Sequence, residues 1–307
     1  MARSPVLFLA VTLALFVTVP LGAQGNFEVV LKRAWVSALA DRTSIDATMD
    51  VRYSHPRGNL VSSGGKDGDL HFSGVSPDVG LPFVAEVVNA RLPGQQTAVA
   101  TIIQHEGSKG VLAVRGAWRL WFEHPSSVRQ TQGKENAFTD RTNPDHSFEI
   151  HPVSRVDQLD LGGSFIPIPG YTAYAANVAF PYFDKCTVTI KASGSGITIR
   201  SKRVTRNYVE FRIELTTDPI AVQDGFIVTA RVLDDNGDEV ADGVRRMIFV
   251  QGTRAADRIR TAVAGDELRV LGVPRISLNK VLTLVQNNGT QQFNAPLPYE
   301  MIIVGVF

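Results

Sequence analysis

GVLAVRGAWRLWF, residues 110–122, is the stretch that decides the fold. Its apolar residues recur at every second position, which is the period of a β-strand and not of a helix. One face of this strand carries Leu112, Val114, Trp118, Leu120 and Phe122, and the opposite face carries Arg115, Arg119 and Trp121. The pattern predicts a long strand with one face in a core and a second face that bears positive charge.

The segments around this strand complete a small barrel. Three strand-like segments and a weakly helical one come before it, and a polar loop and a further strand come after it. These segments are SIDATMDVRY (44–53), DLHFSGV (69–75), PFVAEVVNA (82–90), QQTAVATIIQHEG (95–107) and HSFEIHPV (146–153). The order strand, strand, strand, helix, strand, strand is that of the OB-fold, a five-stranded Greek-key barrel that often binds its ligand on strands 2 and 3.

The second half of the chain is also rich in strand patterns. YTAYAANVAF (171–180) alternates, and two later segments carry helix signals, with Thr253 and Ser277 as caps. We therefore predict a mainly β protein, with an OB-like Greek-key barrel followed by a second β-rich domain with one or two short helices. The predicted divisions are a signal peptide over 1–23, the barrel over 24–156, a Gly- and Pro-rich linker over 157–170, and a sandwich-like domain with C-terminal helices over 171–307.

The first 23 residues have the order of a secretory signal peptide: one arginine, an apolar run, and small residues before the expected cleavage after Ala23. The predicted location is therefore secreted or periplasmic. No later segment is long and apolar enough to be a transmembrane helix. Cleavage removes only Arg3 of the 31 basic residues and none of the 30 acidic ones, so the mature chain is formally neutral. Neutrality makes nucleic acid an unlikely partner.

The stretch KDGDLHF, residues 66–72, places polar side chains before and along the start of the predicted second strand. Carboxylates and an imidazole at alternating positions could hold a divalent metal, so Asp67, Asp69 and His71 are the candidate metal ligands. The same residues also fit a turn at Asp67 followed by the solvated face of a strand. The face of the barrel that we expect to bind a ligand carries Asp69, His71, Glu86, Arg115, Arg119, Trp121, Glu149 and His151.

Two of these residue types suggest a particular ligand. Trp121 shares its face with arginines and is the candidate for stacking on a sugar or a base. Some nucleases combine an OB barrel with clustered acids and arginines, and Asp69, Glu86, Arg115 and Arg119 invite that comparison. No GxSxG-type nucleophile motif supports serine hydrolase chemistry.

Three motifs together, KDGDLHFSG, RGAWRLWFEH and NPDHSFEIHPV, resemble a family of secreted bacterial proteins of unknown function with an OB-like N-terminal domain. The resemblance covers about residues 40 to 156. It implies the barrel and export, and it implies no activity, ligand or catalytic residue.

Three functions fit these observations. The first is a non-enzymatic binding or interaction module with a glycan or protein partner. The second is a metal-dependent hydrolase, nuclease- or esterase-like, with a carboxylate/His site on the barrel. The third is a structural component of the cell envelope. The sequence favours the first, and it identifies neither a ligand nor an oligomeric state.

Overall fold

Strands dominate the computed structural model, which describes residues 27–54, 67–124, 129–134 and 141–307. The mainly β class predicted from the sequence is confirmed. The predicted signal peptide lies outside the described residues, so export remains a prediction. Within the described ranges, no helix is long and apolar enough to cross a membrane.

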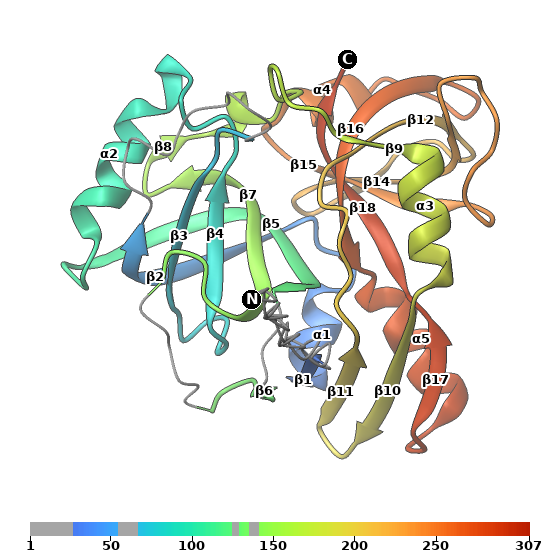
Figure 1. Ribbon diagram of the computed structural model, residues 1–307, viewed down its shortest axis with the longest axis horizontal. Helices are drawn as coiled ribbons and strands as arrows, with labels where there is room; N and C mark the ends of the chain where they lie inside the picture. Colours follow the sequence, from blue (N-terminus) through green and yellow to red (C-terminus); the bar gives the residue numbers. More distant parts are fainter. Residues whose placement is uncertain (1–26, 55–66, 125–128, 135–140) are drawn as a thin grey trace, which may run out of the picture.

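The first barrel has the predicted topology. Its strands are β2 (Ser44–Ser54), β3 (Leu70–Val75), β4 (Phe83–Val87), β5 (Val111–His124) and β7 (His146–Val156). They pair in the order β4-β3-β2-β5-β7, and a parallel pairing of β4 with β7 closes the barrel. α2 (Gln96–His105) lies between β4 and β5 in the chain, as in an OB-fold. It covers the outer end of the barrel (Figure 1).

The second half forms another closed barrel instead of the predicted sandwich-like arrangement. Its strands are β12 (Val209–Leu215), β14 (Gly225–Leu233), β15 (Arg245–Val250), β16 (Glu267–Ile276) and β18 (Tyr299–Val306). The order is β14-β15-β18-β16-β12, and a β12–β14 pairing closes it. Its β15–β18 pairing is parallel, as in the first barrel, and α4 (Arg254–Ile259) again lies between the third and fourth strands. Both barrels therefore have OB topology.

Strand register relates the two barrels residue by residue. In each barrel an arginine of the fourth strand stands opposite a glutamate of the fifth, Arg119 opposite Glu149 and Arg275 opposite Glu300. Each pair is a buried ion pair. A glycine stands before each arginine, where the register shifts: Gly116 and Gly272. These matches make the first barrel and the second barrel equivalent units.

The two arginines also join the barrels. Arg119 donates from Nε to the carbonyl oxygen of Pro274, at 2.9 Å, and Arg275 donates from NH1 to that of Trp118, at 3.2 Å. Each guanidinium thus reaches the residue that precedes the other, and β5 packs against β16. The Arg275 guanidinium also lies over the ring of Trp118, 3.6 Å from its centroid.

A third sheet lies beside the barrels. It has the order β17-β10-β11-β1-β6 and consists of β17 (Phe293–Pro296), β10 (Thr187–Ser193), β11 (Gly196–Ser201), β1 (Phe27–Lys32) and β6 (Gln130–Thr131). α1 (Arg33–Leu39) follows β1 and packs against α5 (Leu278–Asn288). The remaining short elements are β8 (Leu159–Asp160), β9 (Tyr174–Ala175), β13 (Ile220–Val222), η2 (Pro93–Gln95) and η3 (Gly162–Ser164).

The helix signals of the second half are partly confirmed. The Thr253 hydroxyl caps α4 by accepting a hydrogen bond from the amide of Ala256, and the Ser277 hydroxyl caps α5 in the same way. The strand expected over 171–180 is wrong for most of its length, because α3 (Ala176–Lys185) begins there.

The segment predicted as a linker, 157–170, packs between the barrels. Phe165 and Ile168 are buried with residues of both, among them Val88 of the first half and Val273 of the second. Asn89 donates from its side chain to the carbonyl oxygen of Ser164. This segment therefore forms part of the contact that covers one face of the first barrel.

Asp224 supplies a second connection and a testable pH dependence. It is fully buried and accepts hydrogen bonds from the amides of Thr43 and Ser44 and from the Arg42 side chain. Burial alone would raise the pKa of Asp224, but these donors hold it below its usual value. A lowered folded-state pKa stabilises the fold above the unfolded pKa of about 4, and this contribution is lost as the pH falls through the folded value.

We therefore expect Asp224→Asn to lower the free energy of unfolding by about 1–3 kcal/mol at pH 7. The difference from the wild type should shrink as the pH falls below about 4, because the unfolded carboxyl then takes up a proton while the folded one has a lowered pKa. Urea denaturation at several pH values measures both effects, with the exposed Asp257→Asn as the control. A difference that stays constant between pH 7 and pH 3 would contradict the role of the Asp224 charge.

Candidate functional site

Strands β3, β4 and β7 place a row of ionisable side chains on the outer face of the first barrel. Leu70 and Phe72 fill the barrel interior, so the alternation directs His71 outward, and Glu86 and His151 share that outer face. The face is nevertheless covered by the second half of the chain. Asp69, Glu86 and His151 are 5%, 2% and 0% exposed, and the His71 side chain is 18% exposed.

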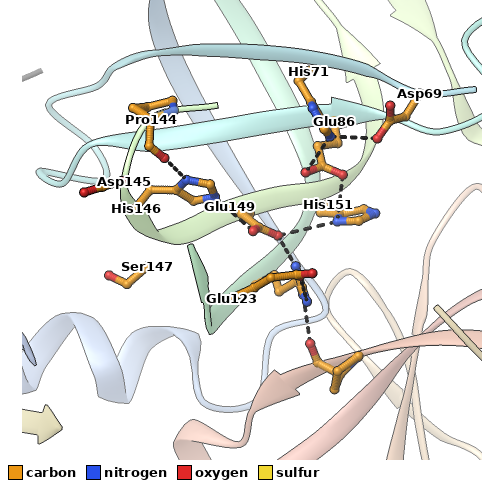
Figure 2. Close-up of polar contacts among 12 residues, drawn as sticks. Asp69, His71, Glu86, Glu123, Pro144, Asp145, His146, Ser147, Glu149 and His151 are labelled. Carbon is orange, nitrogen blue, oxygen red and sulfur yellow. Dashed lines mark hydrogen bonds and ion pairs between the residues drawn. The ribbon is translucent and has the colours of Figure 1, made fainter. Parts of the chain in front are cut away.

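One imidazole faces two carboxylates at the outer end of this row. Nε2 of His71 lies 2.7 Å from Oδ2 of Asp69 and 3.1 Å from Oε1 of Glu86 (Figure 2). Both carboxylates therefore contact the same ring nitrogen of His71, and Oδ2 of Asp69 is buried at this ion-pair distance. Three ligand-type atoms thus converge on one point.

The other Glu86 oxygen faces a second imidazole. Oε2 of Glu86 lies 3.0 Å from Nδ1 of His151, and Oε2 of Glu149 lies 3.4 Å from the same nitrogen. The opposite ring nitrogen of His151, Nε2, hydrogen bonds with the hydroxyl of Tyr208 at 2.8 Å. Tyr208 comes from just before β12, so the second half of the chain orients a side chain of the first barrel.

Glu149 connects this row to further charges. Its carboxylate accepts from Nε2 of His146, at 2.9 Å, and forms the ion pair with Arg119. NH2 of Arg119 also lies 3.4 Å from a carboxylate oxygen of Glu123. The ring of His124 stacks on that of His146, with centroids 4.8 Å apart. These contacts join the carboxylates and imidazoles into one continuous network on the face of the first barrel that the second half of the chain covers.

The charges of the outer end favour opposite protonation states on neighbouring carboxyls. Burial, the Asp69 carboxylate and the Glu86 carboxylate raise the pKa of Asp67 to about 7. Burial would also raise the pKa of Asp69, but His71 and the Asp67 carboxyl lower it to about 2. Burial opposes protonation of His71, yet Glu86 and Asp69 raise its pKa well above the usual value.

At the other end of the row, around Glu149 and His151, charged neighbours shift the pKa values. Burial would raise the pKa of both Glu86 and Glu149, but His151 and His71 lower the former and Arg119 and His146 lower the latter. Burial works against protonation of His151, whereas the Glu86 carboxylate raises its pKa. This end therefore holds anionic carboxylates away from water.

Three groups of side chains in the described part of the chain have the geometry to hold a metal ion. Within each group the ligand atoms lie within 4.8 Å of one another. The groups are Asp69, His71 and Glu86; Glu86, Glu149 and His151; and His124, His146 and Glu149. The first two share Glu86, and carboxylate and imidazole are ligands that zinc accepts.

The second barrel shows that its fold does not require these polar groups. Register places Ile227 opposite Ile248, as His71 stands opposite Glu86, and Ile302 beside Ile248 occupies the position of His151. Gly225 corresponds to Asp69. The buried arginine–glutamate pair is common to both barrels, whereas the carboxylate and imidazole row is specific to the first.

The structure brings together most of the residues singled out from the sequence. Asp69, His71, Glu86, Glu149 and His151 form the network, with Arg119 as the cation paired to Glu149. Asp67 lies beside Asp69 before β3 begins and belongs to none of the three ligand groups.

Two of the predicted ligand-binding residues lie elsewhere. Trp121 is 1% exposed and packs edge-on against Phe183, so its ring is not available to stack on a sugar or base. Arg115 faces Asp46, 3.9 Å away, and lines a separate cavity of about 390 Å³. Burial, which the strand pattern alone does not reveal, overturns the stacking hypothesis.

Sequence reasoning missed four members of the network. They are Glu123, His124, His146 and Tyr208. Glu123 and His124 directly follow the predicted fourth strand, and His146 begins the predicted fifth, so their proximity could be inferred from the pairing of these two strands in an OB barrel. Tyr208 gave no signal, because its contact depends on how the barrels pack.

Comparisons with known proteins do not assign this site. A comparison with protein-family models finds no match, and a comparison with curated proteins finds none. Among solved structures, the chain is matched to a murine DNA-binding protein bound with ds DNA, over 85% of this chain and 99% of that one, with 9% sequence identity and a TM-score of 0.19. A likeness at that score carries no argument about fold or function. The family resemblance described above therefore stays a prediction.

Proposed function

We propose that this protein binds a divalent metal ion through Asp69, His71 and Glu86 and uses it for metal-assisted hydrolysis. The observation that carries the proposal is the convergence at one point of three ligand atoms, two of them on buried carboxylates. Two buried carboxylates that share one imidazole are costly to bury unless a cation balances their charge.

The comparison between the barrels supports this choice. An ion network needed only for packing would be expected in both units, as the Arg–Glu pair is. The second barrel has Gly225, Ile227 and Ile248 at the three ligand positions, and it closes in the same way. Buried ionic groups add little net stability compared with apolar residues of similar volume, so their presence in one barrel only points to a function.

A metal role is favoured over the non-enzymatic binding module that the sequence favoured. That module required an open face on strands β3 and β4, but Asp69 and Glu86 are almost fully buried. A macromolecular partner cannot reach carboxylates at this depth, whereas an ion and a small reactive group can enter beside His71 and Asp67, which are partly exposed.

Three protein ligands suit catalysis because they leave a coordination position for water, and a divalent ion lowers the pKa of that water to about 7. Asp67 lies next to this ligand set and is the most accessible carboxyl beside it. Its position suits a general base that accepts a proton from the attacking water and returns it to the leaving group.

Metal analysis of the purified chain tests the proposal. We expect a stoichiometric divalent ion after dialysis against Zn²⁺ or Mn²⁺, and a loss of affinity of more than about 100-fold in His71→Ala, because a direct ligand matters more than an outer-shell partner. Chromogenic ester and phosphodiester substrates, assayed with and without the ion, test hydrolysis.

His105→Ala is the matched control, because His105 lies on α2 and contacts the carbonyl oxygen of Thr101. It should bind metal as the wild type does. Circular dichroism establishes that both variants fold. A folded wild-type chain that takes up neither ion would refute the proposal, and stable self-association without metal would favour a structural envelope component.

A further inference from the structure

We infer that Glu86 bridges two divalent ions, the second of which is held by Glu86, Glu149 and His151. The inference rests on the proposed function, because it places another ion beside the one held by Asp69 and His71. It changes the site from a single-ion centre to a carboxylate-bridged pair.

The two oxygens of Glu86 point to different ligand groups. Oε1 lies 3.1 Å from Nε2 of His71, and Oε2 lies 3.0 Å from Nδ1 of His151 (Figure 2). A carboxylate that presents one oxygen to each of two ligand sets is suited to bridge ions about 3.5–4 Å apart, the spacing of two-metal hydrolytic sites. A ligand for a single ion would not need an imidazole at both oxygens.

His151 provides an independent observation at the second position. It is 0% exposed, and its Nδ1 has no hydrogen-bond partner among the described residues although two carboxylate oxygens lie within 3.4 Å. With an ion on Nδ1, Nε2 carries the ring hydrogen and donates it to the Tyr208 hydroxyl, 2.8 Å away. Metal-ligating histidines commonly have such an outer partner, which fixes the orientation of the ring.

Carboxyl groups outnumber the guanidinium in this network. Five carboxyl groups belong to it, and the Arg119 guanidinium opposes them. The five are Asp67, Asp69, Glu86, Glu123 and Glu149. Such an excess of oxygen ligands favours the binding of cations.

The contacts of Arg119 are compatible with an ion on Glu149. Its Nε is committed to the carbonyl oxygen of Pro274 and its NH2 faces Glu123, so only NH1 contacts Glu149. A carboxylate oxygen has two lone pairs and can accept from a guanidinium while binding an ion. Arg119 would then hold Glu149 in place as an outer partner.

Manganese binding to the full chain tests the inference. We expect equilibrium dialysis to give two Mn²⁺ per chain, with an electron paramagnetic resonance spectrum showing exchange coupling between the ions. One Mn²⁺ per chain with an uncoupled spectrum would overturn the bridged pair and leave the proposed function standing. No bound Mn²⁺, together with no bound Zn²⁺, would overturn both.

Two variants locate the second ion. His151→Ala should bind one Mn²⁺ and lose the coupling, whereas Tyr208→Phe, which removes only the outer partner, should still bind two. Two coupled ions in a folded His151→Ala chain would show that the second ion lies elsewhere and would overturn the assignment. If His151→Ala does not fold, the wild-type spectrum and stoichiometry decide the question alone.

Discussion

Arg275→Met is expected to lower the free energy of unfolding by about 3–5 kcal/mol, because it leaves Glu300 as a buried charge without its main partner. Both side chains are fully buried, and Nε of Arg275 lies 2.7 Å from Oε1 of Glu300. The substitution also removes the donor to the carbonyl oxygens of Trp118 and Arg42, which join the second barrel to the first. Chemical denaturation monitored by tryptophan fluorescence measures the effect.

Two further variants separate the charge from the packing. Arg231→Met breaks a partly exposed ion pair with Glu214 and should change stability by no more than about 1 kcal/mol. The double variant Arg275→Met with Glu300→Leu should recover part of the loss, because it removes the buried Glu300 charge, and Arg246, which also contacts Glu300, keeps its ion pair with Asp41. If Arg275→Met costs no more than Arg231→Met, the pair is not a main contributor to the barrel junction.

Replacing the polar row by the apolar residues of the second barrel should abolish metal binding while the chain still folds. The variant combines Asp69→Ala, His71→Ile, Glu86→Ile and His151→Ile, with Tyr208→Phe to avoid an orphaned hydroxyl. Apolar replacement of buried ionic groups together with their partners is often neutral or stabilising, by about 1–4 kcal/mol, and Glu149 keeps its contacts with Arg119 and His146. Metal analysis and thermal unfolding of the same preparation measure both results.

The single variant Glu86→Ile provides the contrast. It leaves His71 and His151 without the carboxylate between them, so we expect a loss of about 3–5 kcal/mol in stability. A combined variant less stable than this single one would mean that the row is a structural requirement of the first barrel. That outcome would remove the argument drawn from the second barrel.

The first barrel could be predicted from the sequence because its strands follow one another with a clear period of two and a single helix between them. The second barrel has the same order but was not identified. α5 and β17 are inserted between its fourth and fifth strands, and β13 interrupts the first two. The alternation over 171–180 predicts a strand, whereas Ala176, Ala179, Phe180 and Phe183 recur at helical spacing and are all buried, as α3 requires.

For the site, the sequence predicts which face of each strand a side chain occupies. Alternation correctly placed His71, Glu86 and His151 on the outer face of the barrel, because their neighbours fill the core. It could not predict that this face is buried, since the cover comes from Phe165, Ile168 and Tyr208, which are remote in sequence. For the same reason alternation predicts an exposed Trp121, which the structure buries against Phe183.

The third sheet has a consequence for synthesis of the chain. β1 is paired along its whole length with β11. The backbone hydrogen bonds on that edge of β1, beginning with the pairing of Phe27 and Ser201, therefore form only after residue 201 has been made. Pairing between strands so far apart in sequence makes folding slow, because the intervening chain must first be ordered. While only the first barrel has emerged from the ribosome, the apolar face of β1 and the edge that later pairs with β11 are exposed. Nascent and truncated chains should therefore be prone to aggregate and should depend on chaperones more than the finished protein does.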